Sequence, residues 1–241
     1  KKGFNQLISR ILLKEDTDKL LDLSFSSIKQ LVTYYQISNI SDEQKKDELV
    51  KFSITFDKEK IHQLFYRKGI SYSEVSDKEL YILPILINKN EINVFSNNFF
   101  YENWNEIYKN DLIEFILPQE NIEIIQIINE NRNNLINLDL NNLFVEYKNK
   151  NLALILIENN NYEKIYIKLI IQGKSISKSL SFKKENSNLQ SNNNKIITYT
   201  KKELINLIKS KNLIDIRTPF FLNVKFNINK KNNLVELNSR I

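Results

Sequence analysis

The pattern of apolar and polar positions changes character near residue 79. Upstream, the apolar residues at positions 4, 7, 8, 11 and 12 share one helical face, which predicts an opening amphipathic helix. LVTYYQI, residues 31–37, predicts a strand, and VKFSITF, residues 50–56, alternates as a strand with one buried face does. Asp57 then has the residue type of a helix N-cap, and Gly69 is placed to end that helix. Residues 1–78 are therefore predicted to form a small α+β portion.

Downstream, apolar residues occur in short continuous runs. LYILPILI, LIEFIL and LALILI, at residues 80–87, 112–117 and 152–157, have the pattern of strands buried on both faces, as in a partly parallel sheet. Between them, helices are predicted within 99–108, 122–128 and 138–147. Strands alternating with helices indicate βαβ units. We therefore predict an α/β (α+β) protein, in which three neighbouring interior strands form part of a mixed sheet with flanking helices.

The last third of the chain adds further elements to this sheet. IYIKLII and SISKSLSF, within residues 165–182, predict an antiparallel meander, and residues 183–195 form a polar, low-complexity loop. Thr200 and Glu203 have the spacing of a capping box at the start of a helix. FFLNVKFNI alternates as a strand, and LVELNSRI begins another helix. The predicted domains are 1–78, 79–230 and a short element at 231–241.

Composition weakens the argument from charge. The chain has 36 Asn and 36 Ile against one Ala, three Gly and three Pro, which is the profile of an AT-rich genome. A net charge of +6 would ordinarily raise the expectation of nucleic-acid binding. Because 30 of the 35 basic residues are Lys, a residue that AT-rich codons favour, nucleic acid is an unlikely partner here.

The sequence lacks the residues that several kinds of chemistry require. Without cysteine there are no disulfides, thiolate metal sites or cysteine nucleophiles, and the redox compartment stays undecided. The chain has glycine only at positions 3, 69 and 173. This distribution excludes Gly-rich phosphate loops and dinucleotide-binding fingerprints. His62 is the sole histidine, and the sequence offers no partners for a triad or a zinc site. No catalytic, metal-binding or cofactor-binding residue is predicted, and no cofactor.

Carboxylates leave one catalytic alternative open. Glu120 and Glu123 can share a helical face near Asp111 or Glu114, although the first turn of a helix is also where acidic side chains favourably meet the dipole. An enzyme of this kind, a hydrolase for example, would have its carboxylate site at the strand ends near two prolines, Pro84 and Pro118. Pro84 cannot donate to a strand ladder, so we expect an edge, a bulge or a break there.

An aromatic cluster surrounds the single tryptophan. Phe100, Trp104 and Tyr108 are four residues apart and could form a platform for a ligand or for single-stranded nucleic acid. The same spacing is expected of a helix that packs its aromatic side onto a sheet. The core interpretation is preferred, and the three residues are kept as a possible binding surface.

The order of these segments resembles a known family, the bacterial domain of unknown function 2066. The segments that carry the resemblance are FNQLISRIL, SITFDKEKIHQLF, ELYILPIL, the aromatic segment at Trp104, LIEFILPQENIE, LFVEYKNKNLALILIE and FFLNVKFNI before LVELNSRI. The chain looks like a member from an AT-rich marine alphaproteobacterium. LFVEYKNKNLALILIE, with its meander and helix, is also similar to the N-terminal domain of the periplasmic protein TolB, an analogy of fold.

The resemblance implies an exported protein of the periplasm or cell envelope and implies no activity. Asn121 and Ile124 stand where the family has an acidic pair, which speaks against a carboxylate site at those positions. The chain contains no Met, which indicates a removed leader or an excised fragment, and no apolar run is long enough for a transmembrane helix. We expect a non-catalytic envelope protein that binds or scaffolds another envelope protein through a sheet edge or a cleft. Its oligomeric state is left open.

Overall fold

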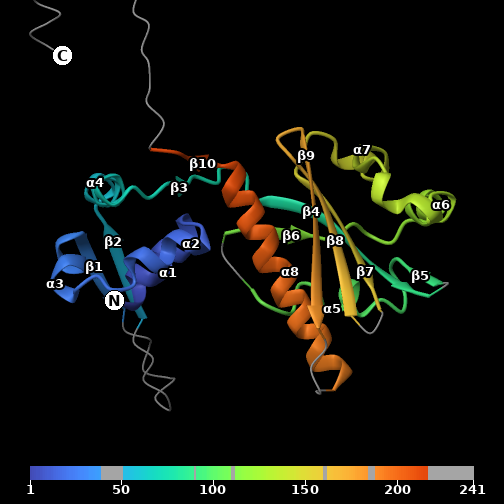
Figure 1. Ribbon diagram of the computed structural model, residues 1–241, viewed down its shortest axis with the longest axis horizontal. Coiled ribbons are helices and arrows are strands. Elements are labelled where there is room, and N and C mark those ends of the chain that lie inside the picture. Colours follow the sequence, from blue (N-terminus) through green and yellow to red (C-terminus); the bar gives the residue numbers. More distant parts are fainter. Residues whose placement is uncertain (39–50, 90, 110–111, 160–161, 184–187, 217–241) are drawn as a thin grey trace, which may run out of the picture.

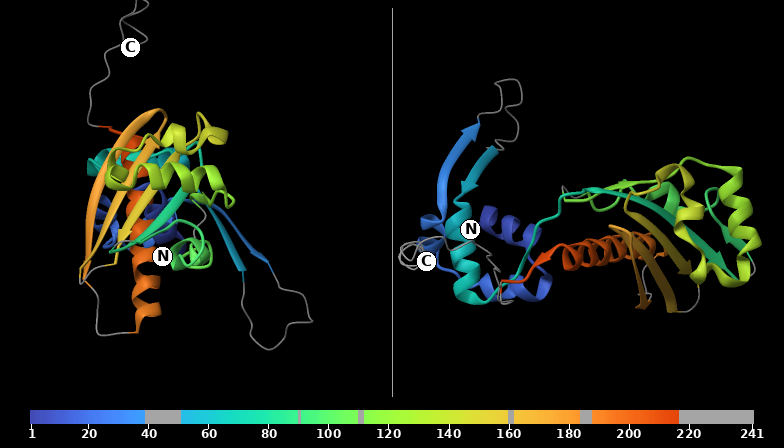
Figure 2. Two further views of the ribbon diagram at one scale, coloured as in Figure 1. Left: turned by 90° about the vertical axis from the view of Figure 1, so that its right-hand side faces the viewer. Right: turned by 90° about the horizontal axis from the view of Figure 1, so that it is seen from above.

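The structure is a computed structural model that describes residues 1–38, 51–89, 91–109, 112–159, 162–183 and 188–216. An N-terminal group of helices with a two-stranded ribbon lies beside a six-stranded mixed sheet that carries helices on both faces (Figure 1). Figure 2 shows the N-terminal group set to one side of the sheet, with the ribbon projecting from it. The predicted α+β class with a mixed sheet and flanking helices is confirmed.

The N-terminal group is built around one apolar cluster. Phe4, Ile8, Leu12, Phe65 and Ile70 are its most deeply buried members, and they come from both ends of the group. The opening helix and the helix after Asp57 form as predicted, with Asp57 accepting the amide of Lys60. The elements are α1 (Lys2–Ile11), α2 (Lys14–Thr17), η1 (Asp18–Leu20), α3 (Phe25–Gln30), β1 (Val32–Ser38), β2 (Lys51–Phe56), α4 (Lys58–Lys68) and β3 (Tyr72–Ser73).

The sheet has two parallel neighbours at its centre. β4 pairs in parallel with β7 along seven residues and with β6 along three, so the three predicted apolar segments do lie side by side. The strand order is β5-β4-β7-β8-β9, and β6 also pairs with β4. The predicted antiparallel meander is confirmed as β7, β8 and β9. The strands are β4 (Glu79–Asn88), β5 (Glu91–Asn93), β6 (Glu114–Ile116), β7 (Leu152–Glu158), β8 (Tyr162–Ile171) and β9 (Lys174–Lys183).

Helices cover both faces of the central strands. Along β4, Leu80 and Ile82 face one apolar cluster, while Leu83 and Ile85 face the other, as the two-residue period of a strand requires. The first cluster also contains residues of α5 (Phe99–Asn103) and α8 (Leu189–Lys211). The second contains residues of α6 (Ile122–Glu130), η3 (Arg132–Asn137) and α7 (Leu140–Leu143), which η4 (Val145–Tyr147) follows.

Pro84 lies where the neighbour of β4 changes. β6 pairs with residues 79–81 and β5 with residues 86–88, so this flank of β4 has no strand at Pro84. The fully buried side chain of Asn98 occupies the gap: its Nδ2 donates to the carbonyls of Pro84 at 2.8 Å, Val94 at 2.8 Å and Asn93 at 3.0 Å. Its Oδ1 accepts two amides at the start of α5. Of the edge, bulge or break expected at Pro84, the structure shows an edge: β4 continues through Pro84 beside β7, and on the other flank Asn98 bonds the Pro84 carbonyl.

α8 begins earlier than the sequence predicted. Residues 189–195 were expected in a polar loop and Thr200 at a helix start, but both predictions are wrong: Asn188 caps the helix by accepting the amide of Ser191, and Thr200 is fully buried in its middle. Ile196 and Ile197 are buried against the sheet, and this packing outweighs the low helix propensity of the asparagines before them. Glu203 pairs instead with Lys178 on β9, at 2.6 Å.

Two buried lysines of α8 hold the ends of other segments. The Lys201 ammonium donates to the carbonyls of Trp104 at 2.6 Å and Ile107 at 2.7 Å, just after α5. The Lys209 ammonium donates to the carbonyls of Ser9 and Leu12 at the end of α1, with 2.9 Å to Leu12. Burial lowers the pKa of each lysine from 10.5 to about 8. α8 therefore ties the N-terminal group to the sheet.

Two predicted helices are shorter than expected. The helix predicted within 99–108 ends at Asn103, and the Lys201 ammonium bonds the carbonyls of Trp104 and Ile107 in the segment that follows. The helix predicted within 138–147 breaks into α7 and η4 at Phe144, whose φ and ψ are −112° and 52°. The final described element is β10 (Leu213–Ile214), which pairs with β3. The strand and helix predicted within 217–241 lie outside the described residues.

Replacing Asn98 by Ala is expected to lower the free energy of unfolding by about 3 kcal/mol or more, because buried carbonyls lose their donor and α5 loses its cap. Urea denaturation measures the loss. Asn121→Ala is the matched control, since Asn121 caps α6 from a more exposed position and its loss costs about 1 kcal/mol. Equal losses in the two variants would contradict the role given to Asn98.

Replacing Lys209 by Met is expected to change how stability depends on pH. Below about pH 8 the folded and unfolded chains both carry the proton on Lys209; between about 8 and 10.5 only the unfolded chain does, so wild-type stability rises with pH in that window. Urea denaturation at pH 7.5 and pH 9.5 should therefore show wild type gaining stability relative to the Lys209→Met variant. Lys211→Met removes one charge at the same helix end, and the same pH profile in both variants would refute this account.

Candidate interaction surface

The structure separates the three aromatic residues that were kept as a possible binding surface. Phe100 is 2% exposed and Trp104 is fully buried, so both belong to the core, as the preferred interpretation held. Trp104 packs edge-on against Phe115 at 6.2 Å, and the Lys201 ammonium lies 5.7 Å from its ring centre. A platform that includes Phe100 and Trp104 is therefore not present at the surface.

Tyr108 alone of the three reaches solvent. It lies outside α5 with φ of 54° and is 36% exposed, and the ammonium of Lys202 stands 5.4 Å from its ring centre. It lines a cavity of about 370 Å³ between α1, α2 and α8, together with Tyr199 and Lys209. Two carboxylates, Asp18 and Glu203, line this cavity, and Glu203 forms an ion pair with Lys178.

The region of Pro84 and Pro118 is packed interior. Pro84 is buried, its carbonyl is held by Asn98, and the Pro118 carbonyl accepts the hydroxyl of Tyr101 at 2.7 Å. Tyr101 packs edge-on against Phe95, and burial, with a smaller effect of Glu120, raises the pKa of its hydroxyl. The geometry gives no support to a carboxylate site at this place.

The remaining candidate groups are dispersed. Glu120 is exposed, and Glu123 is exposed in the first turn of α6, where an acidic side chain favourably meets the helix dipole. Asn121 caps that helix and Ile124 is buried. His62 stacks on Tyr72 at 4.6 Å, and among the residues that the structure describes no three His, Asp or Glu side chains are placed to hold a metal ion.

The largest unexplained feature is the β1–β2 ribbon. Its two strands are antiparallel, with Tyr35 opposite Ile54 and Ile37 opposite Phe52. Because side chains alternate along a strand, these four residues lie on one face, which we call the ribbon face. Gln36, Ser53 and Thr55 lie on the other face. The sequence predicted the alternation correctly.

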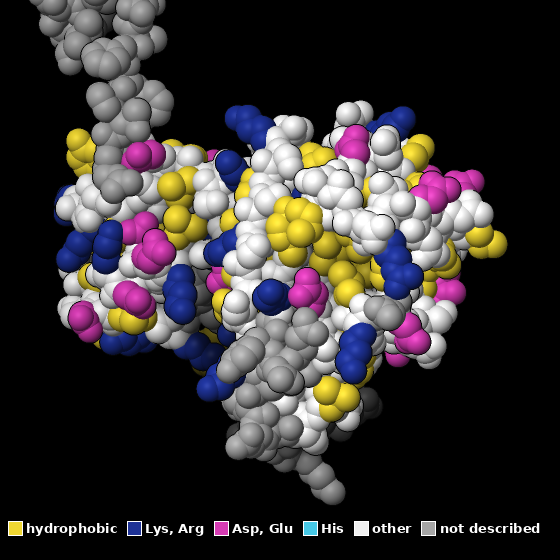
Figure 3. Space-filling model, turned by 45° about the vertical axis from the view of Figure 1, so that its right-hand side comes forward, with side chains coloured by type: hydrophobic (Ala, Val, Ile, Leu, Met, Phe, Trp, Pro, Cys, Tyr) yellow, Lys and Arg dark blue, Asp and Glu magenta, His cyan; other side chains and the backbone are white. Residues whose placement is uncertain are grey.

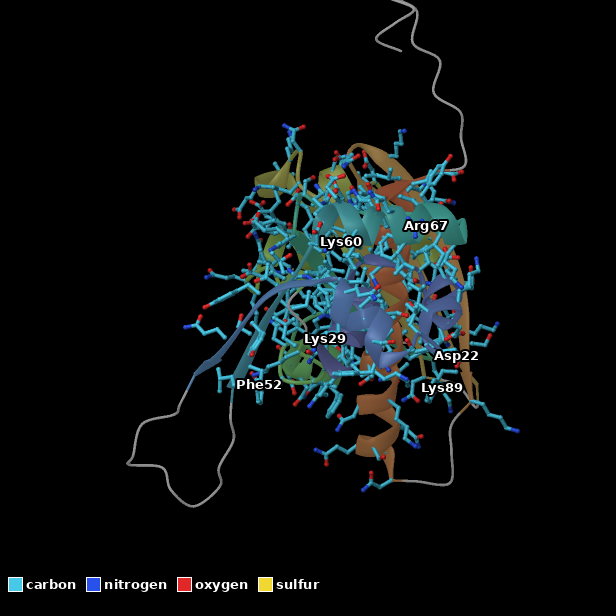
Figure 4. The ribbon with its side chains drawn as sticks, turned by 90° about the vertical axis from the view of Figure 1, so that its left-hand side faces the viewer. Asp22, Lys29, Phe52, Lys60, Arg67 and Lys89 are labelled. Atoms are coloured by element: carbon cyan, nitrogen blue, oxygen red, sulfur yellow. The ribbon has the colours of Figure 1, made fainter. Side chains whose placement is uncertain are left out.

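The ribbon face is open to solvent, which corrects the expectation that this strand is half-buried. Tyr35 is 65% exposed, Ile37 50%, Phe52 61% and Ile54 39%. With Tyr34, the ribbon carries five of the fourteen large apolar side chains that the described residues expose. Single exposed apolar residues are ordinary on proteins, whereas a group on one face marks an interaction site. Figure 4 shows Phe52 on the projecting ribbon, away from Lys60 and Arg67 on α4.

The base of the ribbon is fixed in the core of the N-terminal group. Phe56 packs edge-on against Phe4 at 6.0 Å, and the amide of Asp57 donates to the Leu31 carbonyl at 2.8 Å. Gly3 of α1 lies against Ile54: a Cβ at Gly3 would stand 3.1 Å from the Ile54 Cδ1 atom. The ribbon face is therefore continuous with the core at one end and uncovered at the other.

The sheet also carries a groove. It measures about 600 Å³ and lies beside η3, over β7, β8 and β9. Leu156 and Tyr166 form its floor, and Arg132, Lys164 and Ser179 are at its rim. Its lining combines apolar side chains with basic, acidic, amide and hydroxyl groups, and this combination identifies no class of ligand.

On the face that Figure 3 presents, the charged side chains of the described residues form no single basic patch. Several lysines are paired with carboxylates, at 2.9 Å for Lys150 and Glu79 and at 3.4 Å for Lys58 and Glu74. Figure 3 shows basic and acidic side chains intermixed on the face it presents. This mixture is unlike the basic stripe of a nucleic-acid-binding protein. Within the described part of the chain, moreover, none of the helices combines the length and apolarity that crossing a membrane requires.

Comparisons with known proteins place the chain in no family. No family profile and no curated protein matches it. One solved structure, described as that of an uncharacterized protein, aligns with 57% of this chain and 94% of its own at 9% identity and a TM-score of 0.23. The resemblance to domain of unknown function 2066 and the TolB-like topology therefore stay predictions.

Replacing Phe52 by Ser is expected to change the free energy of unfolding by no more than about 0.5 kcal/mol, because the side chain is largely in water already. Phe4→Ala, at a residue 1% exposed, should cost about 3 to 5 kcal/mol. Urea denaturation compares the two. A large loss for Phe52→Ser would show that the ribbon face is covered in the isolated protein.

Proposed function

We propose that this protein is a non-catalytic protein-binding module whose site is the ribbon face with the adjoining strand edges. Its ligand is an extended polypeptide segment with apolar residues at alternate positions. The observation that carries the proposal is the exposure of Tyr35, Ile37, Phe52 and Ile54 on one face of a ribbon rooted in the core.

The geometry suits addition of a strand. Among the described residues, β1 and β2 pair only with one another, so each has an outer edge with free backbone donors and acceptors. An added strand gains affinity from main-chain hydrogen bonds and specificity from alternate side chains. Apolar side chains of that strand would lie beside those of the ribbon face. Both sets would then be buried against the core of the partner.

The cell envelope is proposed as the location, and another envelope protein as the partner. Both rest on the family resemblance, and neither depends on the geometry of the ribbon. Fractionation of cells that make the protein natively tests the location, and recovery with cytosolic markers would overturn it.

A photo-reactive amino acid at position 52 tests the binding proposal. In native cells it should give a discrete adduct of higher mass, and the further substitution Tyr35→Ser should weaken that adduct severalfold. The matched control is the same photo-reactive group at position 66, where Tyr66 is 72% exposed on α4, away from the ribbon face. Equal adducts at both positions, or none at position 52, would refute the proposal.

A further inference from the structure

The N-terminal group carries a concave surface between α3 and α4, which we call the α3–α4 groove. It measures about 650 Å³, and none of the residues that line it belongs to β1 or β2. Figure 4 looks onto the N-terminal group and shows two of the lining residues, Lys60 and Arg67, along α4. The α3–α4 groove is therefore separate from the ribbon face.

The floor of the α3–α4 groove is the edge of the apolar cluster in the N-terminal group. Leu31 belongs to that cluster and is 9% exposed. Leu23 and Leu64 pack against the cluster and remain partly exposed. These leucines come from both sides of the groove, so an apolar side chain placed between α3 and α4 would extend a core that already exists.

Basic side chains stand at the rim, on the α4 side. Lys60, Leu64 and Arg67 share one face of α4, because they follow one another at spacings of four and three residues. The rise along the helix axis from Lys60 to Arg67 is about 10 Å. None of the described residues that line the groove is acidic. The groove thus presents two basic groups with a leucine between them.

The two basic groups are held in different ways. The Lys60 ammonium donates to the Gln30 carbonyl at the end of α3, at 3.3 Å, and stands 3.6 Å from a carboxylate oxygen of Asp57. The other oxygen of Asp57 accepts the amide of Lys60. Arg67 is exposed and has no ion-pair or hydrogen-bond partner in the part of the chain that the structure describes. Its guanidinium is therefore available to bind a carboxylate through two hydrogen bonds.

We propose that the α3–α4 groove binds an acidic amphipathic helix of a partner protein. A helix laid between α3 and α4 would cover the leucines, as an amphipathic helix does when it enters an apolar groove. Its contact face has acidic residues at positions i and i+7, opposite Lys60 and Arg67, and apolar residues at i+3 and i+4, opposite Leu64. Positions i and i+7 of a helix are also about 10 Å apart along its axis, so the two patterns match.

The charge of the groove favours this occupant over a nucleic acid or a second copy of the chain. A nucleic acid is recognised by a longer basic stripe, whereas this lining combines two basic groups with three leucines. In a symmetric dimer the groove would face its own copy, and the basic groups would repel one another. The inference goes beyond the proposed function, since the site and the helical ligand are both different and nothing is required of the ribbon face.

Selection from a displayed library of helical peptides tests the inference on the full chain. All peptides share one alanine-based scaffold of about 15 residues, a length at which isolated helices begin to form. Positions i, i+3, i+4 and i+7 of one face are randomised. Binders should carry Asp or Glu at i and i+7 and apolar residues at i+3 and i+4, each enriched about fivefold or more over the starting library.

Charge reversal at Arg67 locates the site. In the Arg67→Glu variant, fluorescence anisotropy should show the best selected peptide binding about fivefold or more weakly, because like charges then face each other. Changing the facing acidic residue of the peptide to Lys should restore the affinity. The matched control is Lys68→Glu, which reverses one charge in the same last turn of α4 but lies outside the groove lining. Its affinity for the peptide should be that of the wild type.

No enrichment, enrichment without acidic residues, or equal responses of Arg67→Glu and Lys68→Glu would overturn the inference. Peptides that bind Arg67→Glu normally but are lost when Tyr35→Ser and Phe52→Ser are combined would occupy the ribbon face, which supports the proposed function alone. Binding that Arg67→Glu abolishes and this double variant retains supports the inference alone. Light scattering of the chain without peptide completes the test, because self-association that Arg67→Glu abolishes would assign the groove to a second copy and overturn the inference.

Discussion

The parallel pairing of β4 with β7 is the constraint that organises the sheet domain. The middle of each strand is buried on both faces, so the backbone groups there need hydrogen-bond partners inside the protein and the side chains must pack against other elements. Parallel neighbours cannot be joined by a tight turn, and the connection from residue 89 to 151 supplies α6, η3 and α7 to one face and α5 to the other. α8 covers the other face, where β7 contributes Ala153, the only alanine of the chain.

A chain with so few glycines has to form its turns and end its helices by other means. Gly69 ends α4 in the left-handed region with φ of 61°, but Lys89, Asn97, Tyr108, Asn149 and Gln172 adopt positive φ without being glycine. Asparagine tolerates that region better than most residues. Lysine side chains also donate hydrogen bonds to carbonyls at the ends of helices. Lys201 and Lys209 donate to carbonyls after α5 and at the end of α1, and Lys168 donates to those of Ile136 and Leu138. An amino-acid composition biased toward Asn and Lys thus still supplies the required caps.

The sequence predicted most elements whose apolar pattern is local. The three interior strands, the meander, α1, α4 and α6 followed from periodicity because each buries its own apolar residues. The start of α8 did not, since asparagines 192 and 193 are buried by packing that the local sequence does not reveal. The burial of Lys201 could have been predicted from the sequence. Lys201 falls at helical spacing from Ile197, Leu204 and Ile208, on the inner side of the helix.

The candidate surface was predictable only in part. Alternation in residues 50–56 indicated a strand with an apolar side, and that much is correct. Whether the apolar side is covered depends on which elements reach it, and α1 contacts its base, with Gly3 against Ile54 and Phe4 against Phe56. The burial of Trp104 likewise depended on Phe115 and Lys201, which are distant in sequence. The spacing of apolar residues shows which face of a helix or strand a residue lies on. Whether that face is buried depends on tertiary packing.

The contact of Lys209 with Ser9 spans 200 residues of sequence. At a translation rate of about 5 to 20 residues per second, α1 leaves the ribosome roughly 10 to 40 s before the lysine that holds its last carbonyls exists. During that interval α1 can already pack in the apolar cluster of the N-terminal group, but the carbonyls of Ser9 and Leu12 do not yet have the Lys209 ammonium as a partner. Completion of the N-terminal group is thus a late event in biosynthesis, although its residues are made first.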